Sequence, residues 1–426
     1  MWAGLIAALS IPTTLLADSS SYTETRIYEL PLVDFPYNNG RAPSMKQSLL
    51  ISRDFYYVMH NYILDAQLGD AQIVVGQKIN SWPIVLFDTA SLLIPLGSTW
   101  AHEEWHRASL GAIGVGSVNH MSQLKNYGFY TDSSLSDVEL GKIKTAHPQE
   151  FVRIATAGLE SAYELNLEFE KQAFFNNHHP IVGSLLFQHV VGNFYYMNFC
   201  TNKGEAGGDC TMWVYEMFRP HAPVYQDTSV LTTEERDYLI RQRNLTLLNV
   251  IDPMLFGKKE FVTPSGDWHW NANARHMLTP FGYDIAANVF LKSRDDLDIF
   301  GAIHTYHNDK NTSLGLDATL PRYATRWFDK PVHITPRVFA WMQPDNLMFR
   351  DATTKLGGLA SVRVDVPIEE GWEIYGELES KSKGWVAGNE YLDSKMAVRF
   401  GLTKVIQAPS RWKIAVPVAE KETLPQ

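Results

Sequence analysis

Residues 283–291 read YDIAANVFL, and they show the pattern that governs the C-terminal part of this 426-residue chain. Apolar side chains stand at alternate positions, at Tyr283, Ile285, Val289 and Leu291, with a more polar set between them. Successive side chains of a β-strand point to opposite faces, so this alternation predicts a strand with one apolar face and one polar face.

The same alternation recurs after residue 270. The further segments read IFGAIHTYHN, TSLGLDATL, RVFAWM, SVRVDVP, WEIYGEL and MAVRFGLTK. Together they make about seven segments of roughly 7–10 residues, separated by short turns, which is typical of an antiparallel meander closed into a barrel. We therefore predict an antiparallel β-barrel of about 7–8 strands over residues 271–406, followed by a tail over 407–426.

The two faces of the predicted strands differ in charge. Charged residues stand in mid-strand on the polar face, at Asp317, Arg363, Asp365, Glu373, Glu377 and Arg399. Aromatic residues stand near strand ends, at Trp327, Phe328, Trp341, Trp372 and Trp385. Both features resemble bacterial outer-membrane barrels, which keep charges in the lumen and aromatic girdles at the interfaces. We expect a lipid-exposed barrel, with a soluble barrel whose apolar face points inward as the alternative.

The preceding part of the chain has helical periodicity instead. In residues 148–174, PQEFVRIATAGLESAYELNLEFEKQAF, apolar residues recur three and four positions apart, as at Phe151, Ile154, Ala155 and Leu159. The expected fold class is α+β, with a mostly helical domain over residues 19–270 before the barrel.

Composition narrows the classes of function. A net charge of −10 without a block of basic residues argues against nucleic-acid binding. A mean hydropathy of −0.18 argues against an inner-membrane protein with many spanning helices. Residues 1–18 have the apolar run and small-residue end of a secretory signal peptide. In an exported chain, Cys200 and Cys210, which bracket CTNKGEAGGDC, are expected to form a disulfide.

A possible metal site lies in residues 100–111, WAHEEWHRASLG, where His102, Glu103 and His106 have the spacing HExxH. Residues four apart share one face of a helix, so the two imidazoles can reach one cation. Zinc lowers the pKa of a bound water toward about 7, and a neighbouring carboxylate can accept its proton during attack on a peptide carbonyl. The spacing therefore favours zinc as cofactor and Glu103 as general base.

The motif resembles that of HExxH zinc metallopeptidases, and WAHEEWHRASLGAIG is similar to the motif helix of site-2-protease-type enzymes. This resemblance implies a third protein ligand, and two residues are candidates. Glu160, in ATAGLESAYELN, resembles the downstream ligand of peptidases with a glutamate as third ligand. Asp252, in LLNVIDPML, resembles loosely the aspartate segment of site-2 proteases, although Pro253 stands where that family has glycine.

The expected function is zinc-dependent hydrolysis of a peptide or protein substrate at the bacterial outer membrane, with the periplasm as the alternative location. A different class stays open, namely a non-enzymatic outer-membrane barrel that acts as a channel, scaffold or assembly protein. Its helical part would then be a plug, with a structural metal or none.

Overall fold

The computed structural model describes residues 23–37, 42–68, 73–74, 82–92, 94–122, 128–133, 135–176, 182–201, 208–222, 231–295, 297–409 and 412–413. The expected signal peptide and residues 410–411 and 414–426 of the expected tail lie outside these ranges. No helix among the described residues is long and apolar enough to span a membrane.

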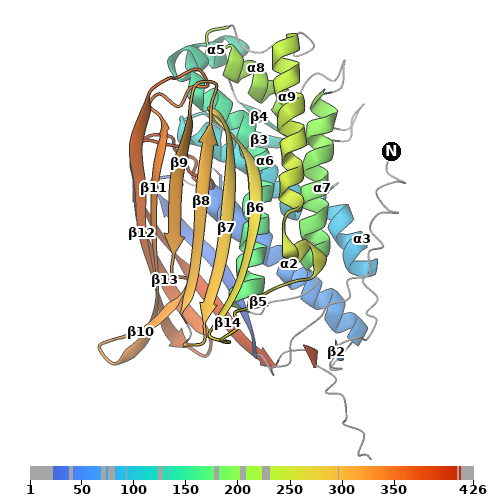
Figure 1. The fold of residues 1–426 in the computed structure, drawn as a ribbon, viewed down its shortest axis with the longest axis vertical. Helices are drawn as coiled ribbons and strands as arrows, with labels where there is room; N and C mark the ends of the chain where they lie inside the picture. Colours follow the sequence, from blue (N-terminus) through green and yellow to red (C-terminus); the bar gives the residue numbers. More distant parts are fainter. Residues whose placement is uncertain are drawn as a thin grey trace, which may run out of the picture.

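A large antiparallel sheet of eleven strands forms one side of the molecule (Figure 1). Its strands are β1 (Thr23–Phe35), β5 (Phe261–Val262), β6 (Trp268–Thr279), β7 (Gly282–Ser293), β8 (Asp298–His307), β9 (Thr312–Thr319), β10 (Tyr323–Trp327), β11 (Lys330–Pro344), β12 (Thr354–Glu369), β13 (Trp372–Lys381) and β14 (Lys395–Pro409). They are ordered β1-β14-β13-β12-β11-β9-β8-β7-β6-β5, and β10 pairs with β11. The predicted meander is present, and β1 extends it with residues that the sequence assigned to the helical domain.

Helices make up most of the remainder. They are α2 (Met45–Leu68), α3 (Trp82–Ser91), α4 (Gly97–Ala112), α5 (Asp137–Ala146), α6 (Pro148–Phe175), α7 (Val182–Thr201), α8 (Asp209–Phe218), α9 (Thr233–Leu245) and the 3-10 helices η2 (Thr246–Val250) and η3 (Pro253–Phe256). Two small sheets pair β3 (Ser117–Ser122) with β4 (Gly128–Ser133), and β2 (Ile73–Val74) with β15 (Trp412–Lys413). The predicted α+β class is therefore present.

The sheet is open, so the prediction of a closed barrel is wrong. Strands β1 and β5 end the strand order and do not pair with each other. The free edge of β1 is covered by helical segments instead. The backbone N–H of Thr25 donates to the carbonyl of Asn176 at the end of α6, and that of Glu29 donates to the Asp54 carboxylate of α2.

The free edge of β6 is covered in the same way by η2 and the residues after it. The backbone N–H of Ala274 donates to the Ile251 carbonyl at 3.1 Å, and that of His276 donates to the Asn249 side chain at 2.6 Å. Unpaired edge groups are what drive a sheet to close or to add strands. Because helical segments bond backbone groups on both edges here, helices rather than strand pairing fill the gap between the two edges of the open sheet.

Helix α6 runs through the centre, against both the sheet and the other helices. Its start fits Pro148, whose missing N–H costs nothing at the first helical position. Most of its side chains are buried, including charged ones, because the curved sheet packs on one side and helices pack on the others. A cavity of about 240 Å³ remains between α2, α6 and the sheet, and many of its lining residues are charged.

The two faces of the sheet differ in polarity, with charged side chains on the inner face and apolar ones on the outer face. On β12, Arg363 and Asp365 point inward and form an ion pair at 2.7 Å, whereas Leu356 and Val362 are exposed. The expected charges on the polar face lie on this inner side, where Arg399 pairs with Glu377 at 2.9 Å. The outer face exposes apolar residues, among them Leu314, Leu316, Val338, Leu378, Met396 and Phe400.

The aromatic residues expected at strand ends divide into two groups. Trp327, Phe328 and Trp372 are exposed, and Phe328 is the most exposed of them at 87 %. Trp341 and Trp385 are buried, so the expectation that they belong to an exposed girdle is wrong. They point inward and pack with Tyr163 of α6 in one hydrophobic cluster.

Candidate metal centre

Helix α4 carries the HExxH motif, with the two histidines one turn apart on the side that faces α6. Its first residue, Gly97, has φ of +55°, and a Cβ there would lie 2.6 Å from the Tyr56 ring, so this start requires glycine. The Nε2 atoms of His102 and His106 lie 3.2 Å apart. The motif therefore forms the pair of imidazoles that the sequence predicts.

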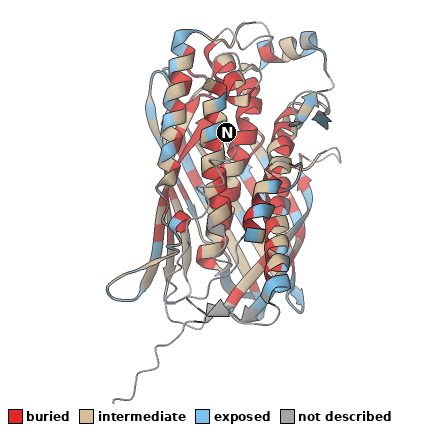
Figure 2. Ribbon diagram, turned by 90° about the vertical axis from the view of Figure 1, so that its right-hand side faces the viewer, coloured by how far each residue is buried: buried red, intermediate tan, exposed pale blue. Residues whose placement is uncertain are grey.

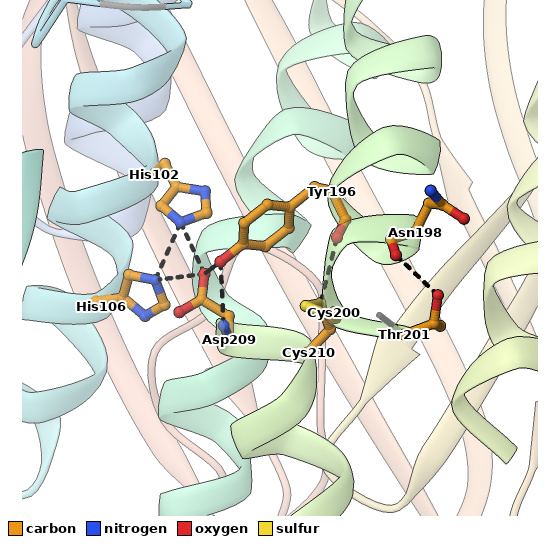
Figure 3. The surroundings of a disulfide bond; sticks show 8 residues. All are labelled: His102, His106, Tyr196, Asn198, Cys200, Thr201, Asp209 and Cys210. Atoms are coloured by element: carbon orange, nitrogen blue, oxygen red, sulfur yellow. Dashed lines mark hydrogen bonds and ion pairs between the residues drawn. A yellow bond between two sulfur atoms is a disulfide. The ribbon is translucent and has the colours of Figure 1, made fainter. Parts of the chain in front are cut away.

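A third donor comes from Asp209, the first residue of α8. Its Oδ2 atom lies 2.9 Å from Nε2 of His102 and 3.4 Å from Nε2 of His106 (Figure 3). Among the described residues, these three are the set of histidine, cysteine and acidic side chains whose ligand atoms converge closely enough for one metal ion, within 4.8 Å of one another.

The donor set fits zinc. Two imidazole nitrogens and a carboxylate oxygen are zinc ligands in catalytic sites, which hold the ion with three protein groups and keep a fourth position open. Ligand atoms at about 2.0–2.1 Å from a tetrahedral zinc lie roughly 3.3 Å from one another. The distances between the three ligand atoms, 3.2, 2.9 and 3.4 Å, match such a triangle.

Hydrogen bonds fix the orientation of these ligands. Nδ1 of His106 donates to the Ile154 carbonyl of α6 at 2.7 Å, which leaves the lone pair of Nε2 directed at the cluster. The Tyr196 hydroxyl of α7 donates to Oδ2 of Asp209 at 3.1 Å and accepts the Asp209 backbone N–H at 3.0 Å. Such outer-shell partners are typical of metal ligands, because they set ring and carboxylate orientation.

A disulfide holds Asp209, the third candidate ligand, in place. Cys200, at the end of α7, is joined to Cys210, which directly follows Asp209 (Figure 3). The two Cα atoms are 6.1 Å apart, within the ordinary range for a disulfide. The cysteines expected to pair do so, and their bond ties the first turn of α8 to the helix that carries Tyr196.

The charges of His106 and Asp209 shift each other's pKa values. Burial alone would lower the pKa of the His106 imidazole, but the adjacent Asp209 carboxylate outweighs it and raises that pKa to about 9. Burial likewise opposes ionisation of Asp209, whose pKa the two histidines nevertheless hold well below its usual range. Without a metal, the cluster therefore favours a histidinium–carboxylate pair, and a cation would replace the shared proton.

Gly158 of α6 makes the close approach of the two helices possible. A Cβ at this position would lie 2.4 Å from Nε2 of His102 and 2.5 Å from Nε2 of His106, in the space between the imidazoles and α6. Any side chain here would displace the ligands. The glycine in ATAGLE is therefore part of the site, whereas the sequence drew attention to the glutamate two residues later.

Glu103 lies beside the cluster, as its place in the motif requires. Its side chain is largely buried, 7 % exposed, and its charge is close enough to act on both His106 and Tyr196. The Thr131 hydroxyl of β4 donates to its backbone carbonyl at 3.0 Å, which joins the β3–β4 hairpin to the motif helix. A buried carboxylate near the His106 imidazole can accept a proton from a group held there.

Glu160 does not join the cluster, because it points to the opposite side of α6 from Gly158. Both guanidinium nitrogens of Arg153 donate to its carboxylate, at 2.6 and 2.9 Å. Trp385 Nε1 and the Gly388 backbone N–H, from the β13–β14 loop, donate at 3.1 and 2.8 Å. The expectation that Glu160 is a metal ligand is therefore corrected: this residue anchors the loop on α6.

Asp252 is also engaged elsewhere. Arg275 of β6 donates to its Oδ2 at 2.7 Å, and the Met254 backbone N–H donates to its Oδ1 at 2.8 Å. The second bond caps the start of η3, which is the ordinary role of aspartate before a proline. The structure therefore separates both expected third ligands from the two histidines.

Sequence reasoning missed Asp209 and Tyr196. Asp209 lies 107 residues after His102, in a Gly-rich loop with no helical pattern that would orient it. Its one signal was its position directly before Cys210, where a disulfide restrains the backbone. Comparisons with protein-family models, with curated proteins and with solved structures find no match to this chain.

Proposed function

We propose that this protein is a zinc-dependent peptidase, in which His102, His106 and Asp209 hold the metal and Glu103 is the general base. The observation that supports it best is the triangle of three ligand atoms, 2.9–3.4 Å apart, beside the glutamate of an HExxH motif. Zinc held by these three residues would supply Lewis acidity toward a carbonyl and toward water.

Side chains of the protein carry out proton transfer and orient the ligands. Glu103 accepts a proton from the attacking water and delivers it to the leaving amine, a role suited to a buried carboxylate beside the ligands. Tyr196 orients the Asp209 carboxylate, and Ile154 orients the His106 ring. The His102 and Asp209 side chains are 25 % and 22 % exposed, so a substrate reaches the site from their side.

We further propose that the sheet contacts a membrane, the bacterial outer membrane, with its outer face against acyl chains. Its inner face is charged and ion-paired, and its outer face exposes apolar residues along neighbouring strands, as at Leu316, Val338 and Leu378. A water-soluble sheet packs its apolar face inward, whereas a sheet in lipid packs it outward.

The matched variants Glu103→Gln and Glu104→Gln test the assignment of the base. Glu104 is the neighbouring buried glutamate, but it is paired with Arg107 and Asn119 away from the cluster. We expect Glu103→Gln to retain zinc and to lose about 100- to 10,000-fold in hydrolysis of a fluorogenic peptide library. Glu104→Gln should retain most activity. Full activity of zinc-loaded Glu103→Gln would contradict the proposed mechanism.

A further inference from the structure

Helical segments complete the circumference that the open sheet leaves unfinished. Along this side α2 packs on β1, α3 packs on α2 and α7, and α7 packs on η2 and η3, which pack on β6. We name these five segments, α2, α3, α7, η2 and η3, the helical wall. Figure 2 views the molecule from this side, and the central helix α6 packs on α2 and α7 of the wall.

The outer surface of the helical wall is apolar. Its exposed large hydrophobic residues have exposed fractions between 38 and 68 %. They are Ile51, Val58 and Tyr62 of α2, Trp82 and Leu86 of α3, Tyr195 and Phe199 of α7, and Leu247, Ile251 and Phe256 in and beside η2 and η3. A helix that covers a core in water has charged and polar residues on its outer face, and this wall has aliphatic and aromatic ones.

Charged side chains are missing from the outside of the wall over long stretches. The 20 residues of α7 include no Asp, Glu, Lys or Arg. The one such residue in α3 is Asp88, which is fully buried against His60 at 2.6 Å. In α2, none lies between Asp54 and Asp65. Water-exposed helices of a soluble protein do not leave such stretches without charge.

Exposed charged residues lie beside the wall. Helix α9, directly before η2, exposes Glu234, Asp237 and Arg241, and Lys258 is exposed two residues after η3. Between these limits, residues 246–256 contain one charged residue, the buried Asp252. The apolar surface of the wall is therefore bordered by exposed charged residues on α9, which packs on α7, and after η3.

From these observations we infer that the helical wall is a second lipid-contacting surface, so that acyl chains surround the molecule on both its strand side and its helical side. The inference rests on the proposed membrane contact of the sheet and extends it. A single protein partner would cover one side, but exposed apolar residues lie both on the outer face of the sheet and on the wall. Hydrocarbon also requires that backbone groups be satisfied internally, and residues in and beside the wall, with Asn176 at the end of α6, accept hydrogen bonds from backbone N–H groups on both sheet edges.

Spin labelling of the full chain in phosphatidylcholine–phosphatidylglycerol vesicles tests this inference. Single cysteines are introduced by Val58→Cys, Leu86→Cys and Tyr195→Cys on the wall, with the native disulfide intact. Leu316→Cys reports the sheet and Asp237→Cys reports the charged border. Collision of each nitroxide with oxygen and with a water-soluble nickel chelate is then measured. We expect the oxygen-to-nickel ratio at the three wall sites to match that at Leu316 and to exceed that at Asp237 several-fold.

The outcomes separate this inference from the proposed membrane contact of the sheet. High nickel collision at the wall with high oxygen collision at Leu316 would overturn the helical surface and leave the sheet in lipid. High nickel collision at all sites would overturn both. Immobilised wall labels that neither reagent reaches would mean that a protein, such as a second copy, covers the wall, and would also overturn the inference.

Discussion

Two sides of helix α6, only two residues apart in sequence, arrange buried polar groups in opposite ways. On the Glu160 side, one carboxylate receives hydrogen bonds from Arg153, Trp385 and Gly388, so that donors and acceptor match. On the Gly158 side, two imidazole nitrogens and a carboxylate oxygen converge, and all three can donate a lone pair.

The difference separates a structural cluster from a candidate functional one. A matched network stabilises one arrangement of the chain and needs nothing further. Three lone-pair donors in a triangle repel one another unless a proton or a metal lies between them. The residue types alone do not show this distinction, because both clusters consist of ionisable side chains. The geometry of each cluster shows it.

The largest effect on stability should follow from removing the charge of Glu160, whose carboxylate is matched by hydrogen-bond donors. Glu160→Gln leaves the Arg153 charge buried without a counter-ion, which typically lowers the free energy of unfolding by about 3–5 kcal/mol. Zinc stoichiometry should not change. Glu164→Gln, one turn later on the same helix, lines the cavity and is less buried, so we expect less than about 1 kcal/mol. Denaturant unfolding measures both, and zinc loss in folded Glu160→Gln would contradict the separation of the two sides.

Removing the third ligand should have the next largest effect, on metal affinity. Zinc sites with four ligands contribute roughly 10–16 kcal/mol, so one ligand corresponds to about 3 kcal/mol, or a loss of at least about 100-fold in zinc affinity for Asp209→Ala. Asp252→Asn serves as the matched control, because that carboxylate binds Arg275 instead. Competition with a chromophoric chelator measures the affinity. Equal affinity in wild type and Asp209→Ala would exclude Asp209 as a ligand.

A methyl group at position 158, facing the two imidazoles, should have a smaller effect. Gly158→Ala places its Cβ against both imidazoles, an overpacking that costs about 1–3 kcal/mol of stability and weakens zinc binding. Gly192→Ala in α7 meets no atom within 4 Å and should be neutral or up to about 1 kcal/mol stabilising, because alanine favours a helix. Thermal unfolding with and without zinc compares them. Unchanged zinc affinity in Gly158→Ala would refute the proposed contact.

The smallest effect on zinc affinity should come from Tyr196, which holds the Asp209 carboxylate. Tyr196→Phe removes a hydroxyl that makes two hydrogen bonds to Asp209, so we expect zinc affinity to fall by roughly 10-fold. The neighbouring Tyr195 is 44 % exposed, and among the described residues no hydrogen bond joins it to Asp209, so Tyr195→Phe should leave the affinity unchanged. Isothermal titration with zinc resolves a difference of this size. Equal zinc affinity in the two variants would show that Tyr196 does not support the site.

The sequence predicted local features well and long-range ones less well. Strand alternation identified the meander and the character of its two faces, because both depend on the two-residue period alone. It could not show that the sheet stays open, since that depends on β1 at the other end of the chain and on edge bonds from Asn249 and Asp54. Glu160 and Asp252 were suggested by resemblance, but the direction in which each side chain points depends on packing.

The central claim is that one zinc ion binds to His102, His106 and Asp209. X-ray absorption at the zinc edge, on the full chain with one equivalent of zinc, tests it most directly. We predict two imidazole nitrogens and a carboxylate oxygen at about 2.0–2.1 Å, with the imidazole scattering halved in His106→Ala. Zinc that does not bind at one equivalent, or a spectrum unchanged by both His106→Ala and Asp209→Ala, would contradict the account.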